Sequence, residues 1–251
     1  MGLAWHRQLA AAWRCTEGRP PRRAITLSSL ALLRVEEILT DARYRRRGLE
    51  TEGIDPIFKF ALETELLGYV PTRWRALRAL FRNKSITSDD VLLDYGSGKG
   101  RTLIWAAAKY PFRRIIGIEL DAQHNATAEA NLARWRGRRL CTEVDIVQAD
   151  ATEYDVPDDV TIIFFANPFF GAVFEKVVTK IQESLARNPR ELTILYYHAR
   201  MHETLINAGF QLERQRNSPP NDWAIYRYPR TADRSPAVAG QPARPRSSDV
   251  A

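Results

Sequence analysis

Two hydrophobic patterns alternate along residues 91–228 and predict a regular succession of strands and helices. Short apolar runs, typical of buried strands, occupy residues 91–95, 113–120, 143–150, 160–166 and 191–198. Helical spacing of apolar residues, every three or four positions, occupies residues 101–110, 121–135, 172–186 and 201–210. Two further strands are predicted at 210–217 and 221–229, on either side of a Ser-Pro-Pro sequence.

This alternation predicts an α/β fold, in which helices cover both faces of a mainly parallel sheet. The last two predicted strands lie too close together for a helical crossover, so we expect them to pair antiparallel and to close the sheet. With these two strands the sheet has seven.

The segments that flank residues 91–228 carry a different pattern. Residues 1–52 are rich in arginine and contain one amphipathic stretch at 28–46, which predicts a basic, partly helical N-terminal extension. Residues 53–90 predict a helical entry segment, with two short helices around the turn Tyr69-Val70-Pro71-Thr72. Residues 229–251 are rich in Pro, Ala, Arg and Ser, a composition that predicts a disordered tail.

Composition narrows the class of protein. The formal net charge is +7, of which residues 1–52 contribute +4 and residues 229–251 contribute +2. Because the basic excess lies mostly in the flanks, it is weak evidence for a nucleic-acid groove. No apolar stretch of 18 residues occurs, so no membrane contact is expected. Two cysteines allow no disulfide framework or zinc spacing, and we expect a reducing, cytoplasmic compartment and no metal.

The sequence LLDYGSGKGRT, residues 92–102, follows the first predicted strand and is the main candidate for a ligand-binding loop. A phosphate-binding loop requires a glycine where Leu93 stands and a hydroxyl residue where Gly100 stands, so that interpretation fails at two positions. The dinucleotide fingerprint requires a third glycine where Arg101 stands, which weakens an NAD site without excluding it. What remains is the pattern Asp-x-Gly-x-Gly-x-Gly.

Acidic and amide side chains stand at the ends of the predicted strands. Asp94, Glu119 and Asp150 end the first three strands, and Asn167 ends the fourth. Ligands of such sheets bind beyond the carboxyl ends of the strands, where these side chains gather. Carboxylates accept hydrogen bonds from an amine and from ribose hydroxyls, but they suit a pyrophosphate poorly.

These motifs resemble those of the class I S-adenosylmethionine-dependent methyltransferases over about residues 69–228, with Asp94, Glu119 and Asp150 in the order of the first three family motifs. More narrowly, the sequences DYGSGKGRTLIWAA, IIGIELD and IFFANPFFG are similar to those of enzymes related to the non-SET histone-lysine methyltransferases. Tyr95 replaces a leucine that is usual in that group. Asn167-Pro168-Phe169 also resembles the Asn-Pro-Pro-aromatic motif of amino-methylating enzymes, but it lacks the second proline, which weakens a base-flipping role.

The resemblance implies a Rossmann-like methyltransferase domain at residues 53–228, with S-adenosyl-L-methionine as cofactor. It implies the following cofactor-binding residues: Asp94, Gly96, Ser97, Gly98, Gly100, Glu119, Asp150, Ala151, Asn167 and Thr72. The catalytic residues that it implies are Asn167, Tyr69 and Phe169.

Three functions remain open at this stage. The first is methyl transfer to an amine, with a protein lysine as the favoured acceptor. The second is methyl transfer to a small molecule or a nucleic acid, and the third is a non-catalytic docking protein that binds the cofactor. No general base is evident in the sequence, and His198 is assigned a structural role, which suits an amine better than an unactivated hydroxyl.

Overall fold

The computed structural model describes residues 27–53, 68–82, 84–217 and 222–230. Its strands are β1 (Val91–Tyr95), β2 (Arg114–Glu119), β3 (Val144–Gln148), β4 (Ile162–Phe165), β5 (Leu192–Tyr197), β6 (Gln211–Arg216) and β7 (Trp223–Tyr228). Its helices are α2 (Leu27–Arg45), α4 (Trp74–Phe81), α5 (Arg101–Lys109), α6 (Ala122–Arg134), α7 (Gly171–Arg187) and α8 (His202–Asn207). Every strand and helix predicted within 91–228 is therefore present.

The seven strands form one sheet in the order β3-β2-β1-β4-β5-β7-β6. Strands β1 to β5 pair in parallel, whereas β7 pairs antiparallel with both β5 and β6. The predicted fold class is confirmed, including the antiparallel closing strand. The order of the strands reverses between β1 and β4. Because β1, β2, β3, β4 and β5 are parallel, their carboxyl ends lie at one edge of the sheet.

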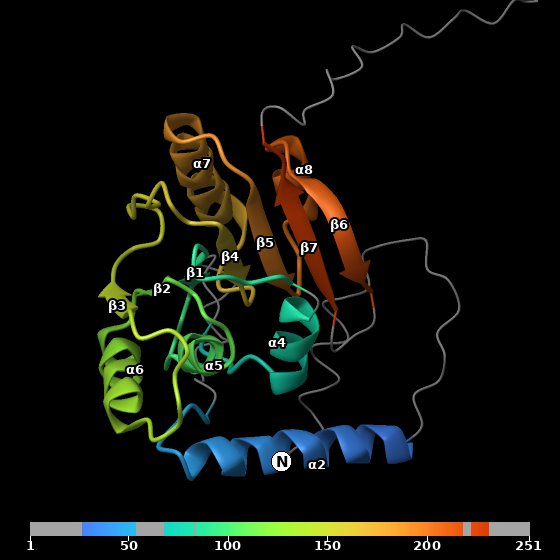
Figure 1. Cartoon of the computed structure of the whole chain (residues 1–251). Coiled ribbons are helices and arrows are strands. Elements are labelled where there is room, and N and C mark those ends of the chain that lie inside the picture. Colours follow the sequence, from blue (N-terminus) through green and yellow to red (C-terminus); the bar gives the residue numbers. More distant parts are fainter. Residues whose placement is uncertain (1–26, 54–67, 83, 218–221, 231–251) are drawn as a thin grey trace, which may run out of the picture. The chain divides into compact units, whose positions relative to one another are not determined.

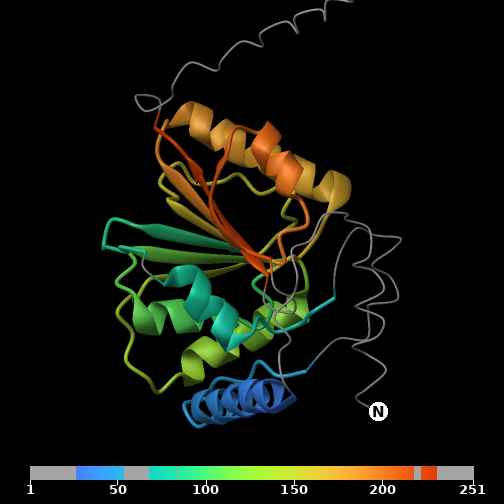
Figure 2. The same ribbon diagram turned by 90° about the vertical axis from the view of Figure 1, so that its right-hand side faces the viewer.

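Helices cover both faces of this sheet, as Figures 1 and 2 show. Along β1, Leu92 belongs to the apolar core under α4 and α5, whereas Leu93 and Tyr95 belong to the opposite core. The opposite core contains the apolar side of α7, including Phe174, Val177 and Ile181, together with residues of α8. Because successive side chains of a strand point to opposite faces, continuous apolar strands are expected in a sheet that is covered on both sides.

The flanking segments are described only in part. By its contacts, the chain divides into two units between residues 36 and 37. Residues 37–52, which the sequence places in an N-terminal extension, therefore belong to the same compact unit as the sheet. The first helix expected in the entry segment and the expected disordered tail beyond residue 230 lie outside the described residues. No helix in the described ranges is long and apolar enough to cross a membrane.

Candidate active site

The glycine loop turns sharply at the end of β1. The backbone N–H groups of Gly96 and Ser97 donate to the carbonyl oxygen of Ile118 in β2, at 2.8 and 3.0 Å. Gly96 and Gly98 have positive φ angles of 71° and 53°, which residues with a Cβ rarely adopt. A Cβ on Gly96 would lie 2.4 Å from Pro168 Cβ, and one on Gly98 would lie 2.5 Å from the ring of Tyr69. Glycine is thus required both by conformation and by space.

Asp94 lies beneath this loop and lacks a complete set of hydrogen-bond donors. Its side chain is buried, and its Oδ1 atom has no hydrogen-bond partner in the described structure. Burial raises the pKa of Asp94 well above its ordinary value, and the charge of Glu119 raises it further, whereas a hydrogen bond from Thr102 lowers it. The hydroxyl of Ser97 is also buried and has no hydrogen-bond partner among the described residues. A ligand that brings an ammonium group would supply the donor and the positive charge that Asp94 lacks.

Glu119 and Asp150 continue this row of acids along the edge of the sheet. Glu119 Oε2 accepts the backbone N–H of Gly98 at 2.9 Å, and Oε1 accepts that of Asp121 at 2.9 Å. Two bonds hold this carboxylate in place while each oxygen keeps a second acceptor site, the arrangement that a pair of ribose hydroxyls needs. A backbone hydrogen bond joins the segment before Asp150 to Glu119, since the N–H of Ala149 donates to the Glu119 carbonyl at 3.0 Å.

Asp150 is exposed, and its Oδ1 accepts bonds from the backbone N–H and the hydroxyl of Thr152, both at 2.8 Å. Ala151, beside it, is partly exposed. The structure therefore brings Asp94, Glu119 and Asp150 to three neighbouring strand ends, as the sequence predicts. These three carboxylates fit S-adenosylmethionine. The buried Asp94 matches its amine, Glu119 with its two backbone bonds matches its ribose, and the exposed Asp150 matches its adenine. Their roles as ligands to the cofactor stay predictions.

The turn at residues 69–72 lies over the glycine loop. The ring of Tyr69 contacts Gly98, and its hydroxyl donates to the carbonyl of Thr51 at 2.6 Å. The ammonium of Lys99 lies 4.5 Å from the centroid of the same ring. Thr72 is buried, and its carbonyl accepts a bond from Arg101 at 3.2 Å. Both sequence-predicted residues of this turn thus lie next to the loop.

Arg101 is a residue that the sequence analysis missed, since it noted only the absence of a glycine there. Its buried guanidinium donates to Thr51 Oγ1 and to Asp41 Oδ1, both at 2.8 Å, and lies over the ring of Trp74. Asp41 also accepts the indole N–H of Trp74 at 2.7 Å. Arg101 therefore connects residues 41–51, the turn at 69–72 and the first turn of α5. Its partners are 29 to 60 positions away, so no local pattern indicates them.

Asn167 lies beyond β4 in an unusual backbone conformation. Its φ angle is 55°, its side chain is buried, and its Oδ1 atom has no hydrogen-bond partner within the described ranges. The next residue, Pro168, contacts the position of Gly96, so the Asn-Pro turn is adjacent to the glycine loop. A buried acceptor without a donor costs free energy, which indicates that a ligand supplies the donor.

Phe169 and Tyr95 have a different environment from the one expected of site residues. Phe169 is buried in the core under α7, with its ring centroid 6.2 Å from that of Tyr95 and 6.1 Å from that of Phe165. Tyr95 stacks on Phe165 with centroids 5.2 Å apart, on the same face. These contacts are packing contacts. The catalytic role expected for Phe169 stays a prediction, whereas Asn167 and Tyr69 adjoin the loop.

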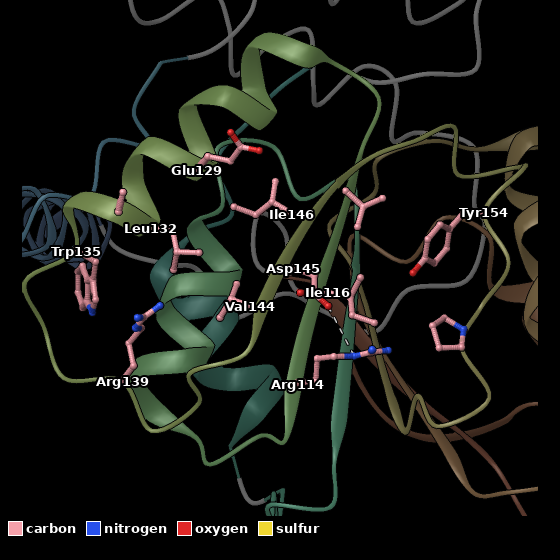
Figure 3. Close-up of a pocket in the computed structure, with 13 residues that line it drawn as sticks. Arg114, Ile116, Glu129, Leu132, Trp135, Arg139, Val144, Asp145, Ile146 and Tyr154 are labelled. Carbon is pink, nitrogen blue, oxygen red and sulfur yellow. Dashed lines mark ion pairs between the residues drawn. The ribbon is translucent and has the colours of Figure 1, made fainter.

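A concavity of about 920 Å³ lies elsewhere, around the edge strand β3 (Figure 3). It is lined by residues of β2, β3, α6 and the segment 154–157, and none of the predicted site residues contributes to it. Arg114 points into it beside Asp145, with the two charged groups 3.9 Å apart. In the described part of the chain, no cluster of three or more His, Cys, Asp or Glu side chains could hold a metal ion.

Comparison with known proteins identifies a methyltransferase domain in part of this chain. The protein-family model described as a methyltransferase domain matches residues 92–188. A protein-lysine N-methyltransferase of Saccharolobus islandicus is 26% identical over 122 residues, which cover 49% of this chain and 72% of that protein. The histone-lysine N-methyltransferase of Drosophila melanogaster that is specific for H3 lysine 79 is 24% identical over 112 residues, 41% of this chain but only 6% of that protein.

Among solved structures, the yhhF protein of Escherichia coli, which carries the name of a methyltransferase, has a TM-score of 0.51 at 18% identity, over 64% of this chain and 88% of that one. This likeness shows the fold. The chain therefore contains a class I S-adenosylmethionine-dependent methyltransferase domain, and S-adenosylmethionine is its cofactor.

Proposed function

We propose that this enzyme transfers the methyl group to an amine, and that its favoured acceptor is a lysine side chain of a protein. The observation that carries the proposal is Asn167, a buried amide with an unpartnered oxygen beside the glycine loop. The names of the two relatives support a protein lysine as the acceptor, at about a quarter identity over half of this chain or less.

The residues at the edge of the sheet divide into two groups in this proposal. Asp94, Glu119 and Asp150 bind the amine, the ribose and the adenine of the cofactor, while the ring of Tyr69 covers the loop and restricts water. The cofactor supplies a methyl group already activated by its sulfonium, so the protein's task is mainly to orient the acceptor. Asn167 Oδ1 accepts a hydrogen bond from the neutral amine and directs its lone pair toward that methyl group.

The test is methyl transfer by the full-length chain from labelled S-adenosylmethionine. Protein extract, nucleic acid and small metabolites are offered separately, and hydrolysis of the labelled product identifies the modified residue. We expect label in the protein fraction, recovered as methyl-lysine. Label confined to nucleic acid or to metabolites contradicts the lysine assignment, and no transfer to any pool contradicts catalysis.

Asn167→Ala is then expected to lower kcat by about 100-fold or more, because the lost bond acts mainly on the transition state. Its effect on cofactor affinity should be much smaller. Asn207→Ala, at an exposed position at the end of α8, is the matched control and should leave both quantities unchanged. Near-normal turnover in a folded Asn167→Ala protein would show that Asn167 only ends β4 and does not orient the acceptor.

A further inference from the structure

Backbone strain marks a second residue beside Asn167. Among the described residues, two that are not glycine have positive φ angles, Asn167 at 55° and His198 at 56°. They follow adjacent parallel strands, since β4 pairs with β5 and Phe165 lies opposite Tyr196. Asn167 and His198 each lie two positions beyond that pair, at the edge of the sheet where the glycine loop lies. Strained backbone of this kind concentrates at functional sites.

The imidazole of His198 is held by a carboxylate. Its Nδ1 atom lies 2.9 Å from Oδ1 of Asp222, whose side chain is only 11% exposed, and the N–H of His198 donates to the Asp222 carbonyl at 3.1 Å. A carboxylate acceptor at Nδ1 favours the neutral tautomer that carries its proton there. In that tautomer Nε2 is the basic nitrogen. The side chain of His198 is 28% exposed, so solvent reaches it.

The ring of Tyr197 lies 3.9 Å from that of His198, and burial raises the pKa of Tyr197, so this phenol stays neutral. The charges that act on Tyr197 are those of Arg73, Asp222 and Glu37. Arg73 follows Thr72, so the turn that adjoins the glycine loop also approaches the end of β5. His198 therefore lies at the same edge of the sheet as Asn167, at the end of the neighbouring strand.

We propose that His198, oriented by Asp222, is the proton acceptor for the substrate amine, an inference that rests on the proposed transfer to an amine. An alkyl ammonium has a pKa of about 10.4 and is protonated at neutral pH, so it must lose a proton before its nitrogen can attack. The N–H bond of the ammonium breaks, and its proton passes to His198 Nε2. The amine lone pair then forms the N–C bond to the methyl group, and the electrons of the broken C–S bond stay on sulfur. The imidazolium, stabilised by Asp222, releases the proton to water.

The first test needs no turnover. Nitrogen-15 NMR of the imidazoles in the full-length chain, with His198 assigned from His198→Gln, reports which ring nitrogen carries the proton. We expect the proton of neutral His198 on Nδ1, and we expect this preference to weaken in Asp222→Asn. His202, whose Nδ1 pairs with the Tyr226 hydroxyl at 2.8 Å, is the internal control and should not change. A proton found on Nε2 of neutral His198 would overturn the proposal.

The second test separates proton transfer from a structural role. Transfer of labelled methyl from S-adenosylmethionine to poly-L-lysine is measured at pH 7 and at pH 10, with melting temperatures for every variant. His198→Gln and Asp222→Asn should lower kcat at pH 7 by about 100-fold and 10-fold, and His202→Gln should change it less than twofold. At pH 10, where much of the amine is already neutral, the deficit of His198→Gln should shrink at least fivefold, whereas that of Asn167→Ala should persist.

The outcomes distinguish the two proposals. An equal deficit of His198→Gln at both pH values, or no deficit at either, refutes proton transfer while leaving the amine acceptor intact. Failure of the wild-type chain to methylate poly-L-lysine and the protein extract refutes the amine acceptor itself, and the role of His198 falls with it. If His198→Gln fails to fold, Asp222→Asn gives the same comparison.

Discussion

Asp94→Asn should stabilise the free protein and weaken its cofactor binding, two effects of opposite sign from one substitution. The Asp94 side chain is 1% exposed, its Oδ1 has no partner in the described structure, and Glu119 adds a second negative charge nearby. The change to asparagine removes the buried charge and keeps the volume. The ionised carboxylate therefore destabilises the free protein, but it strengthens binding when an ammonium group lies against it.

The magnitudes follow from the contacts. Burying an ionised carboxylate without a full set of partners costs about 1–3 kcal/mol or more, and the neutral amide removes the cost of burying the charge, so the asparagine should stabilise the free fold by about 1–3 kcal/mol near pH 8. For a chain of this size the melting temperature should rise by about 2–4 °C for each kcal/mol. A hydrogen bond to a charged group contributes about 1.5–3 kcal/mol, so the Kd for S-adenosylmethionine should rise about 10- to 150-fold.

The effect of Asp94→Asn on stability should depend on pH. Because the pKa of Asp94 is raised in the folded chain, its neutral form stabilises the fold below the unfolded pKa of about 3.9, and this contribution is lost as pH rises through the folded pKa. The difference in melting temperature between Asp94→Asn and wild type should therefore be small near pH 5 and larger near pH 8. Scanning calorimetry at both pH values measures it, and titration calorimetry measures the cofactor. A lower melting temperature at pH 8, or an unchanged Kd, would refute the reasoning.

Three further substitutions test the cofactor site and its support. Glu119→Ala should weaken binding of S-adenosylmethionine by about 1–3 kcal/mol in titration calorimetry, since it removes the ribose acceptor and the bond to the Gly98 N–H; an unchanged affinity in a folded protein would place Glu119 outside the site. Gly98→Ala should destabilise the loop by about 1–3 kcal/mol, because its φ is 53° and the added Cβ meets Tyr69; a melting temperature equal to wild type would contradict this. Arg101→Met should lower the free energy of unfolding by about 2–3 kcal/mol, measured by denaturant unfolding; this is less than for a fully buried ion pair because Asp41 is 24% exposed. Hydrogen exchange should also increase at residues 41–51. Unchanged exchange there would show that Arg101 does not hold that segment.

The sequence by itself determined the strands, the helices and the glycine loop at the end of the first strand, because these depend on local patterns. Apolar runs such as 91–95 and 192–197 form buried strands wherever they are covered on both faces, and the spacing of Gly96, Gly98 and Gly100 encodes a loop with positive φ angles. Parallel strands bring their carboxyl ends to one edge, so the row of Asp94, Glu119 and Asp150 was predictable without coordinates.

The tertiary structure alone decided which distant residues support that loop and which carboxylate lies against His198. Arg101 contacts Asp41 and Thr51 across 60 and 50 positions, and nothing in the local pattern distinguishes it from a helix arginine in solvent. His198 and Asp222 meet because β7 returns antiparallel beside β5, and Phe169 packs into the core that also contains the apolar side of α7. The physical reason is that burial, strain and the partners of a charge depend on the packing of elements far apart in the chain, whereas periodicity reports only the element to which a residue belongs.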